Sequence, residues 1–245
     1  MKGVVLAGGK GTRLYPLTQT TNKHLLQVGK EPMVFHPIRQ LISAGIEDIL
    51  IITSMEYVDE MKCLLKAERN WRCHFTFKVQ GEAKGIAHGL LLAEKFACND
   101  AITVVLGDNI ASHTIRPYVE KFHQQEKGAK VLLKKVTQPE RFGVAILNNN
   151  KIVGIEEKPT HTLSPYAVTG IYMYDKNVFD IIRETQPSPR GEWEISEVNN
   201  LYIHRQELTY DLLEGEWVDA GTFTSYQYAN QLLFRINNEI ISGER

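Results

Sequence analysis

The stretch LAGGKGTRL, at residues 6–14, has the composition of an anion-binding loop. Its glycines have no side chains, so backbone N–H groups can approach a ligand closely, and nearby cations favour a negatively charged one. Arg13 lies within the loop, and Lys23 follows shortly afterwards in NKHLL. An apolar run precedes the loop, so the sequence predicts a phosphate site at the end of the first strand.

Two familiar phosphate loops do not fit this stretch. A P-loop requires Gly, four residues and then Gly-Lys-Ser/Thr, which no register of GGKGTRL supplies. The dinucleotide fingerprint G-x-G-x-x-G begins at Gly9 and Gly11 but reaches Leu14 where its third glycine belongs. The acidic residue expected at the end of the second strand is also missing, because that strand ends in Ser54 and Glu31 lies in the polar turn GKEP. A dinucleotide-dependent oxidoreductase is therefore disfavoured.

Asp108 is the first candidate for a metal ligand. It ends the apolar run AITVVLGD, and open α/β sheets bind ligands at the carboxyl ends of their strands. Mg²⁺ commonly takes one or two carboxylates together with substrate oxygens. Asp219 in EWVDAG could be a second ligand, although an Asp before Ala-Gly is equally typical of a turn. The eight histidines are scattered and form no recognisable Ser-His-Asp or Cys-His arrangement.

Short apolar runs alternate with longer amphipathic stretches in the first half of the chain. Strands are predicted at residues 3–8, 48–54, 74–79 and 101–108, and helices at 33–45, 55–68 and 86–97. This alternation indicates an α/β fold with a Rossmann-like, mostly parallel central sheet and helices on both faces.

The pattern changes after about residue 114 to paired strands and turns. Strands are predicted at residues 130–136, 142–147, 151–157 and 166–175, with the NNN at 148–150 as a hairpin turn, and helices at 177–184, 194–205 and 223–241. We see no linker or repeat. The sequence predicts one domain, 1–245, in which an α/β half at about 1–113 carries a smaller, more antiparallel lobe at about 114–245.

Composition narrows the functional class. The chain has 245 residues, 43% hydrophobic and 23% charged, with a net charge of −1 and a pI near 6.7, so it has no general attraction to nucleic acid or to an anionic membrane. No segment is typical of a signal peptide or a spanning helix, which favours a cytoplasmic protein. Cys63, Cys73 and Cys98 form no CxxC pair and are predicted to be reduced and mostly buried.

The loop LAGGKGTRL followed by NKHLL resembles the signature of the sugar nucleotidyltransferases. The resemblance continues in order through VQGEAKGIAHGL, VLGDN, PERFGVAIL, IEEKP, YAVTGIYMYD, RGEWEIS and WVDAG, and covers about residues 1–225. Within that family the set is most similar to members that join dTTP to glucose 1-phosphate, giving dTDP-glucose and pyrophosphate. Such a product feeds the synthesis of deoxysugars of the dTDP-rhamnose type and of surface polysaccharides.

The resemblance assigns roles to individual residues. The predicted nucleotide-binding residues are Leu6, Gly8, Gly9, Gly11, Thr12, Arg13, Gln80, Gly85 and Asp108. The predicted sugar-phosphate-binding residues are Asn109, Gly143, Glu157, Lys158, Val168 and Arg190, which makes the second half a sugar-binding lobe. Catalysis is assigned to Arg13, Lys23, Asp108 and Asp219, with Mg²⁺ held by the two aspartates.

The implied chemistry needs no general base. A sugar phosphate has a second pKa of about 6, so it is mostly ionised at neutral pH and can attack the α-phosphorus directly. The amide of Gln80 could pair with the N3–H and O4 edge of thymine or uracil. Three alternatives remain: UTP or CTP as the nucleotide, another sugar 1-phosphate, or a non-catalytic nucleotide-sugar sensor.

Some residues depart from the family pattern. His24 and Gln27 stand where Gln and Pro are usual, Lys84 where an acidic residue is frequent, Phe142 where Tyr is usual, and Ala220 where Thr is frequent. Longer members carry a further C-terminal segment that contributes to a regulatory site, so feedback by a dTDP-sugar is expected to act here by competition at the active site. The resemblance also implies a homo-oligomer.

Overall fold

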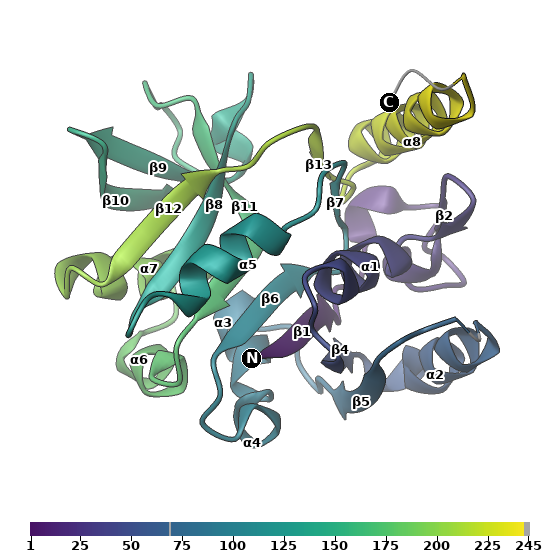
Figure 1. The fold of residues 1–245 in the computed structure, drawn as a ribbon, viewed down its shortest axis with the longest axis horizontal. Coiled ribbons are helices and arrows are strands. Elements are labelled where there is room, and N and C mark those ends of the chain that lie inside the picture. The colour runs from purple at the N-terminus through teal and green to yellow at the C-terminus, as the bar shows by residue number, and fades with distance from the viewer. Residues whose placement is uncertain (69, 243–245) are drawn as a thin grey trace.

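One nine-stranded sheet runs through the molecule in a computed structural model that describes residues 1–68 and 70–242. The strand order along the main path is β10-β9-β11-β6-β1-β4-β5, and β8 pairs with both β11 and β12 (Figure 1). Because β11 of the second half pairs with β6 of the first half, the two halves share a single sheet. The α/β fold with a mostly parallel central sheet is confirmed.

Four strands form the parallel part of the sheet. They are, in spatial order, β6 (Ile102–Leu106), β1 (Lys2–Ala7), β4 (Asp48–Thr53) and β5 (His74–Val79). Their carboxyl ends lie at one edge of the sheet, and the loops that begin there start with Gly8, Gln80 and Gly107. The phosphate-type loop and Asp108 are therefore brought to the same edge.

Successive residues of the central strands point to opposite faces of the sheet, and each face has its own apolar core. Val4 of β1 packs with one core, which also contains residues of the helices α3 (Ile86–Leu91), α4 (Glu94–Ala97), α6 (Val178–Glu184) and α7 (Ile195–His204). Val5 packs with the other, with the helices α1 (Phe35–Ser43), α2 (Val58–Ala67) and α5 (Arg116–His123). Helices thus cover both faces, as predicted.

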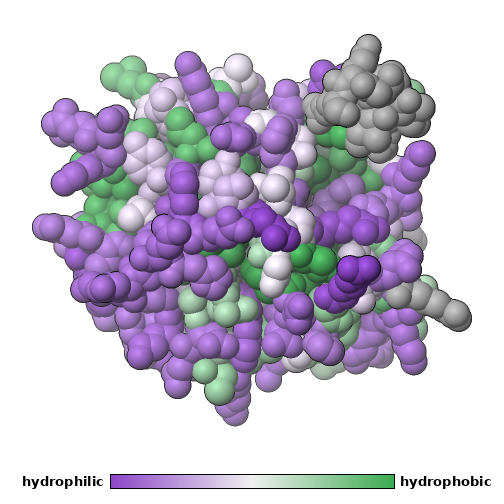
Figure 2. Space-filling model, viewed as in Figure 1, coloured by the Kyte–Doolittle hydropathy of each residue, from purple (hydrophilic) through white to green (hydrophobic). Residues whose placement is uncertain are grey.

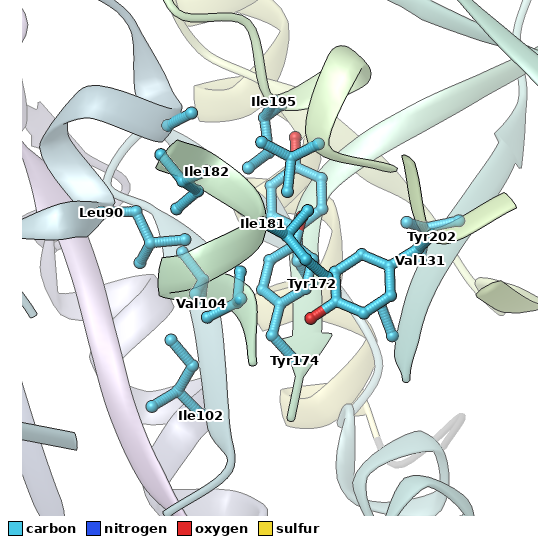
Figure 3. Packing of buried hydrophobic residues seen from close by; sticks show 14 of the residues in the cluster. Leu90, Ile102, Val104, Val131, Tyr172, Tyr174, Ile181, Ile182, Ile195 and Tyr202 are labelled. Atoms are coloured by element: carbon cyan, nitrogen blue, oxygen red, sulfur yellow. The ribbon is translucent and has the colours of Figure 1, made fainter. Parts of the chain in front are cut away.

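The second lobe is built mainly from antiparallel pairs. Its strands are β8 (Ala129–Lys135), β9 (Gly143–Asn148), β10 (Lys151–Glu157), β11 (Tyr166–Tyr174) and β12 (Leu208–Leu212). The turn between β9 and β10 has positive φ at Asn149 (48°) and Asn150 (59°), a conformation that Asn tolerates and that suits the twist of a hairpin. In the core beneath, Tyr174 stacks on both Tyr172 and Tyr202, with ring centroids 5.9 Å apart in each of these two pairs (Figure 3).

Two short ribbons and the last helix complete the fold at the binding edge. The ribbons are β2 (Gln27–Val28) with β3 (Glu31–Pro32), and β7 (Asn109–Ala111) with β13 (Trp217–Asp219). Helix α8 (Phe223–Ser242) lies beside both (Figure 1), and its Leu232 packs with Val28 and Val218 in a third core. Tyr226 donates to the Gln27 carbonyl at 2.6 Å.

Several sequence predictions need correction. The helix predicted at 86–97 is two helices, and strands β2, β3, β7, β12 and β13 and helix α5 were not predicted. The three cysteines are not mostly buried: Cys63 and Cys98 are exposed and Cys73 is half-buried. Cys63 lies on the exposed face of α2, Cys73 lies in a bend just before β5, and Cys98 lies at the C-terminal end of α4. None of these positions encloses its side chain.

The surface of the molecule is mostly polar, in contrast to its apolar core. One face of the molecule, shown in Figure 2, is mostly hydrophilic, with apolar side chains in small separate areas. Within the described part of the chain, no helix combines the length and apolar character required to span a bilayer.

Candidate active site

A cavity of about 300 Å³ opens at the carboxyl ends of the parallel strands. Fourteen of the residues singled out from the sequence line it: Leu6, Gly8, Gly9, Arg13, Lys23, Gln80, Gly85, Asp108, Asn109, Gly143, Glu157, Lys158, Val168 and Asp219. Residues from both halves of the chain therefore meet in one space.

The ribbon of β7 and β13 brings the two aspartates together. Asn109 of β7 is the pairing partner of Asp219 of β13, and the N–H of Ala220 donates to the Asp108 carbonyl at 2.9 Å. An ideal Cβ on Gly221 would lie 2.7 Å from Asp219 Oδ1 and 3.3 Å from Asp108 Oδ2. The same point is 3.3 Å from Arg13 Nη2, so two carboxylates and one guanidinium converge on the space that this glycine leaves open.

The carboxylates are in different electrostatic environments. Burial alone would raise the pKa of Asp108, but the Lys23 ammonium, which forms an ion pair with its Oδ2, holds that pKa well below its usual range. Burial and then the charge of Asp108 raise the pKa of Asp219. Lys23 at Asp108 and Arg13 near Asp219 offset the charge of this carboxylate pair. Such a pair fits a divalent cation, with the remaining coordination positions left for substrate oxygens and water.

His24, which stands where the family usually has Gln, is buried beside the two aspartates. Burial, followed by the charge of Lys23, lowers the pKa of His24 to about 3, so its ring is neutral at physiological pH. Its Nδ1 lies 2.7 Å from the Asn22 side-chain oxygen, which also accepts the His24 backbone N–H at 2.9 Å. His24 thus fixes the start of the turn that carries Lys23 and adds no charge.

Gln80, the candidate for contacting the nucleotide base, packs on the glycine loop at Gly8, whereas Lys23 packs on it at Gly9 and Gly11. Its N–H donates to the Thr53 carbonyl at 2.8 Å, continuing the pairing of β4 and β5, and its Nε2 donates to the Glu82 carbonyl at 3.1 Å. The side-chain amide packs directly on Gly8, where any Cβ would collide with Oε1. The amide is thereby fixed in one plane with its remaining donor and acceptor available.

The segment that contains Trp193 closes this side of the cavity. The Trp193 N–H donates to the Lys84 carbonyl at 2.8 Å, and its carbonyl accepts from Ala87 at 3.2 Å. Gly85 lies between these two contacts and lets the segments approach so closely that a Cβ would meet the Trp193 carbonyl. The indole contacts the His88 ring in a tilted arrangement, with ring centroids 5.7 Å apart and an interplanar angle of 36°.

At the far end of the cavity, β9 and β10 present Glu157. It pairs with Gly143, where an ideal Cβ would come within 3.4 Å of Glu157 Oε2. That oxygen accepts from Ser196 at 3.0 Å, and Lys158 Nζ lies 3.5 Å from Oε1. A fixed carboxylate beside an ammonium suits a ligand that offers hydroxyls next to a phosphate.

Comparison with known proteins agrees with this geometry. Residues 2–235 match the family model described as nucleotidyl transferase. The chain belongs to the nucleotidyl transferase family. A glucose-1-phosphate thymidylyltransferase of Neisseria meningitidis is 39% identical over 97% of this chain and 84% of its own length, and one of Mycolicibacterium smegmatis is 38% identical over 92% and 79%.

Solved structures give the same result for this nucleotidyl transferase. A putative glucose-1-phosphate thymidylyltransferase from Bacillus anthracis, in complex with a sucrose, is 53% identical, with a TM-score of 0.91 over 95% of both chains. A UDP-glucose pyrophosphorylase complexed with UDP-glucose has a TM-score of 0.84 at 24% identity, over 96% of this chain and 98% of its own, and shares the fold.

Three predicted site residues of this nucleotidyl transferase do not line the cavity: Gly11, Thr12 and Arg190. Gly11, with φ of 67°, packs against the side chain of Lys23. Arg190 Nη2 lies 2.8 Å from Glu194 Oε1 and 3.4 Å from Glu157 Oε1, so its charge is engaged by carboxylates.

Asn109 lines the cavity with its amide already occupied. Its Oδ1 accepts from the Gly170 N–H at 2.9 Å and from Trp217 Nε1 at 2.8 Å, and its Nδ2 donates to Asp108 Oδ1 at 3.2 Å. In this state it positions Asp108.

Arg141 also lines the cavity, but no sequence feature singled it out as a site residue. Only its place next to the motif residues Phe142 and Gly143 could have indicated it.

Proposed function

We propose that the chain transfers a thymidylyl group from dTTP to glucose 1-phosphate, giving dTDP-glucose and pyrophosphate in a Mg²⁺-dependent reaction. The observation that carries this proposal is the meeting, in one cavity, of the glycine loop, the aspartate pair and Gln80 with Glu157 and Lys158. The names of the relatives at 35–39% identity favour the same substrates. The product would serve the synthesis of deoxysugars and surface polysaccharides.

In the proposed reaction a phosphate oxygen of glucose 1-phosphate attacks the α-phosphorus of dTTP. A new P–O bond forms as the bond to the bridging oxygen of the β-phosphate breaks, and pyrophosphate leaves with that electron pair. The nucleophile is already ionised, so no residue has to accept a proton. The protein therefore acts by positioning its substrates and by neutralising negative charge.

Each charged residue has a part in this proposal. Arg13 and the amides of the glycine loop bind the triphosphate, and Lys23 moves from Asp108 to a phosphate oxygen as substrate enters. Asp108 and Asp219 hold Mg²⁺, which supplies Lewis-acid stabilisation of the charge that develops on the phosphoryl oxygens. Lys158 binds the phosphate of the sugar, and Glu157 accepts hydrogen bonds from its hydroxyls.

A pyrophosphate-release screen tests the proposal. dTTP, UTP, CTP and GTP would each be combined with glucose 1-phosphate and other sugar 1-phosphates, with Mg²⁺ or with EDTA. We expect the highest kcat/KM for dTTP with glucose 1-phosphate, and no turnover in EDTA. Release from no pair would favour a nucleotide-sugar sensor, whereas equal or faster reaction with UTP or CTP would reassign the nucleotide.

The base preference gives a second prediction. Changing Gln80 to Ala removes two hydrogen bonds to the pyrimidine edge, each worth about 1 kcal/mol, so kcat/KM for dTTP should fall roughly 30-fold. The difference between dTTP and UTP should persist, because the thymine methyl contacts other atoms. We expect UTP to react measurably but more slowly than dTTP, and GTP poorly.

Steady-state kinetics with the four triphosphates would check this expectation. Gln124→Ala, an exposed glutamine after α5, is the matched control and should leave kcat/KM unchanged. A Gln80→Ala enzyme with wild-type efficiency for dTTP would remove Gln80 from the base site.

A further inference from the structure

Arg141 has no assigned role, although its side chain lines the cavity at the end that holds Glu157 and Lys158. It ends the single-turn 3-10 helix Pro139–Arg141, immediately before β9. Among the side chains that the structure describes, which leave out residues 69, 237 and 239–245, no carboxylate oxygen lies within 4.0 Å of its guanidinium, and both of its hydrogen-bond contacts are with neutral groups. These side chains therefore do not neutralise its positive charge.

The neighbouring cations are different in this respect. Lys158 Nζ lies 3.5 Å from Glu157 Oε1, and Arg190 Nη2 lies 2.8 Å from Glu194 Oε1. Both pairs reduce the net charge offered to a ligand. An incoming phosphate would compete with a carboxylate at either residue but not at Arg141.

The Arg141 side chain is held in place without using up its donors. The guanidinium lies over the Phe142 ring at 5.7 Å, and Phe142 in turn contacts Trp217, with ring centroids 5.2 Å apart. Nη1 lies 3.5 Å from Gln138 Oε1 and Nη2 lies 3.3 Å from Thr222 Oγ1, two long contacts at the edges of the planar group. The remaining N–H groups are available as a flat, bidentate fork, the geometry that suits phosphate oxygens.

The contact with Thr222 places Arg141 relative to the reacting centre. Thr222 follows Gly221, the residue around which Asp108, Asp219 and Arg13 converge. On the other side, the Lys158 N–H donates to the Phe142 carbonyl at 3.0 Å. Arg141 therefore lies between the aspartate turn and Lys158, where the phosphate of a sugar 1-phosphate must be held for attack.

We propose that Arg141 is a further catalytic residue, which binds the phosphate of the sugar 1-phosphate. This phosphate becomes the β-phosphate of the product. The inference rests on the proposed function, since it requires that a nucleotide and a sugar phosphate share this cavity. The sugar-side phosphate would then be bound by two residues: Lys158, and Arg141, which packs on the Phe142 ring.

Binding of two ligands by isothermal titration calorimetry tests the inference without turnover. dTDP-glucose carries the sugar-side phosphate, whereas dTMP carries only the α-phosphate. We expect Arg141→Gln to weaken dTDP-glucose binding about 10- to 100-fold, as for loss of hydrogen bonds to a charged group, and to leave dTMP binding unchanged. Arg141→Lys should restore part of the loss, because an ammonium supplies charge without the fork.

Two further variants separate a binding role from a structural one. Thr222→Val removes the hydroxyl that contacts Arg141 and should change dTDP-glucose binding much less than Arg141→Gln. Arg72→Gln replaces an exposed arginine outside the cavity and should change nothing.

Each outcome is decisive. If Arg141→Gln binds dTDP-glucose as the wild type does, the inference is wrong and the proposed function stands. Equal weakening of dTMP and dTDP-glucose would mean that Arg141 acts through the turn at Asp219, which also overturns it. A wild-type protein that does not bind dTDP-glucose would overturn the proposed function and this inference together.

Discussion

Asp108→Asn is expected to reduce kcat by roughly 10²- to 10³-fold, the usual cost of removing one preorganised charge-stabilising group from an enzyme site. The amide keeps the shape of the carboxylate but removes its negative charge. Asp108 is ionised in the wild type, because it forms an ion pair with Lys23 and its pKa is lowered. Stability should fall modestly, because the substitution removes the ion-pair partner of Lys23 but also relieves the repulsion that raises the pKa of Asp219.

Pyrophosphate release at saturating substrates and a thermal melt would measure both effects. The matched control is Asp59→Asn, an exposed aspartate of α2 that pairs with Lys62. Near-wild-type kcat in the Asp108 variant would remove this residue from the metal site. A large fall in Tm would instead show that the carboxylate is needed mainly for folding.

Lys23→Met should have an effect of similar size on kcat/KM, with an additional signature. Without the ammonium, two buried carboxylates face each other with the more distant Arg13 guanidinium as a nearby positive charge, so we expect the Tm in EDTA to fall by roughly 5 °C. Mg²⁺ should restore much of this loss, because it supplies the missing positive charge, and the half-saturating Mg²⁺ concentration should be lower than in the wild type.

Lys10→Met is the control for this experiment, since Lys10 is an exposed cation of the same glycine loop that does not line the cavity. Tm with EDTA and with Mg²⁺, and turnover against Mg²⁺ concentration, would be measured for both variants. A Lys23 variant whose Tm is insensitive to Mg²⁺ would contradict a shared cation site at Asp108 and Asp219.

The strands and helices with strong periodicity were predictable from the sequence. The four parallel strands are apolar runs that begin and end within two residues of the predicted positions. Their order along the sheet depends on crossover connections, which the residues do not encode locally. The hairpin turn at 148–150 was predictable because Asn favours turns, and Asn149 and Asn150 adopt the positive φ that this turn requires.

The missed elements are those in which distant segments determine the conformation. Strands β7 and β13 have three residues each and exist because they pair with one another. Sequence motifs assigned Asp219 to the site by resemblance, but only the pairing of β13 with β7 explains how it reaches Asp108.

Arg141 illustrates a different limit. Its importance depends on which other charges lack partners, and that is a property of the assembled cavity. From the sequence, Arg190 was the predicted phosphate ligand and Arg141 was not selected, although both lie in motifs shared with the family. Only the positions of Glu157 and Glu194 distinguish the engaged arginine from the available one.

The ribbon of β7 and β13 also has a consequence for the order in which the protein is built. It joins residues 109–111 to residues 217–219, so the contact that completes the aspartate pair closes a loop of more than a hundred residues. Closing such a loop has an entropic cost that a nascent chain cannot offset until the second segment has left the ribosome. The parallel strands can pair much earlier, because all four lie within the first 106 residues. During synthesis, the chain would therefore have much of its sheet well before the proposed site for a metal ion and a triphosphate is complete.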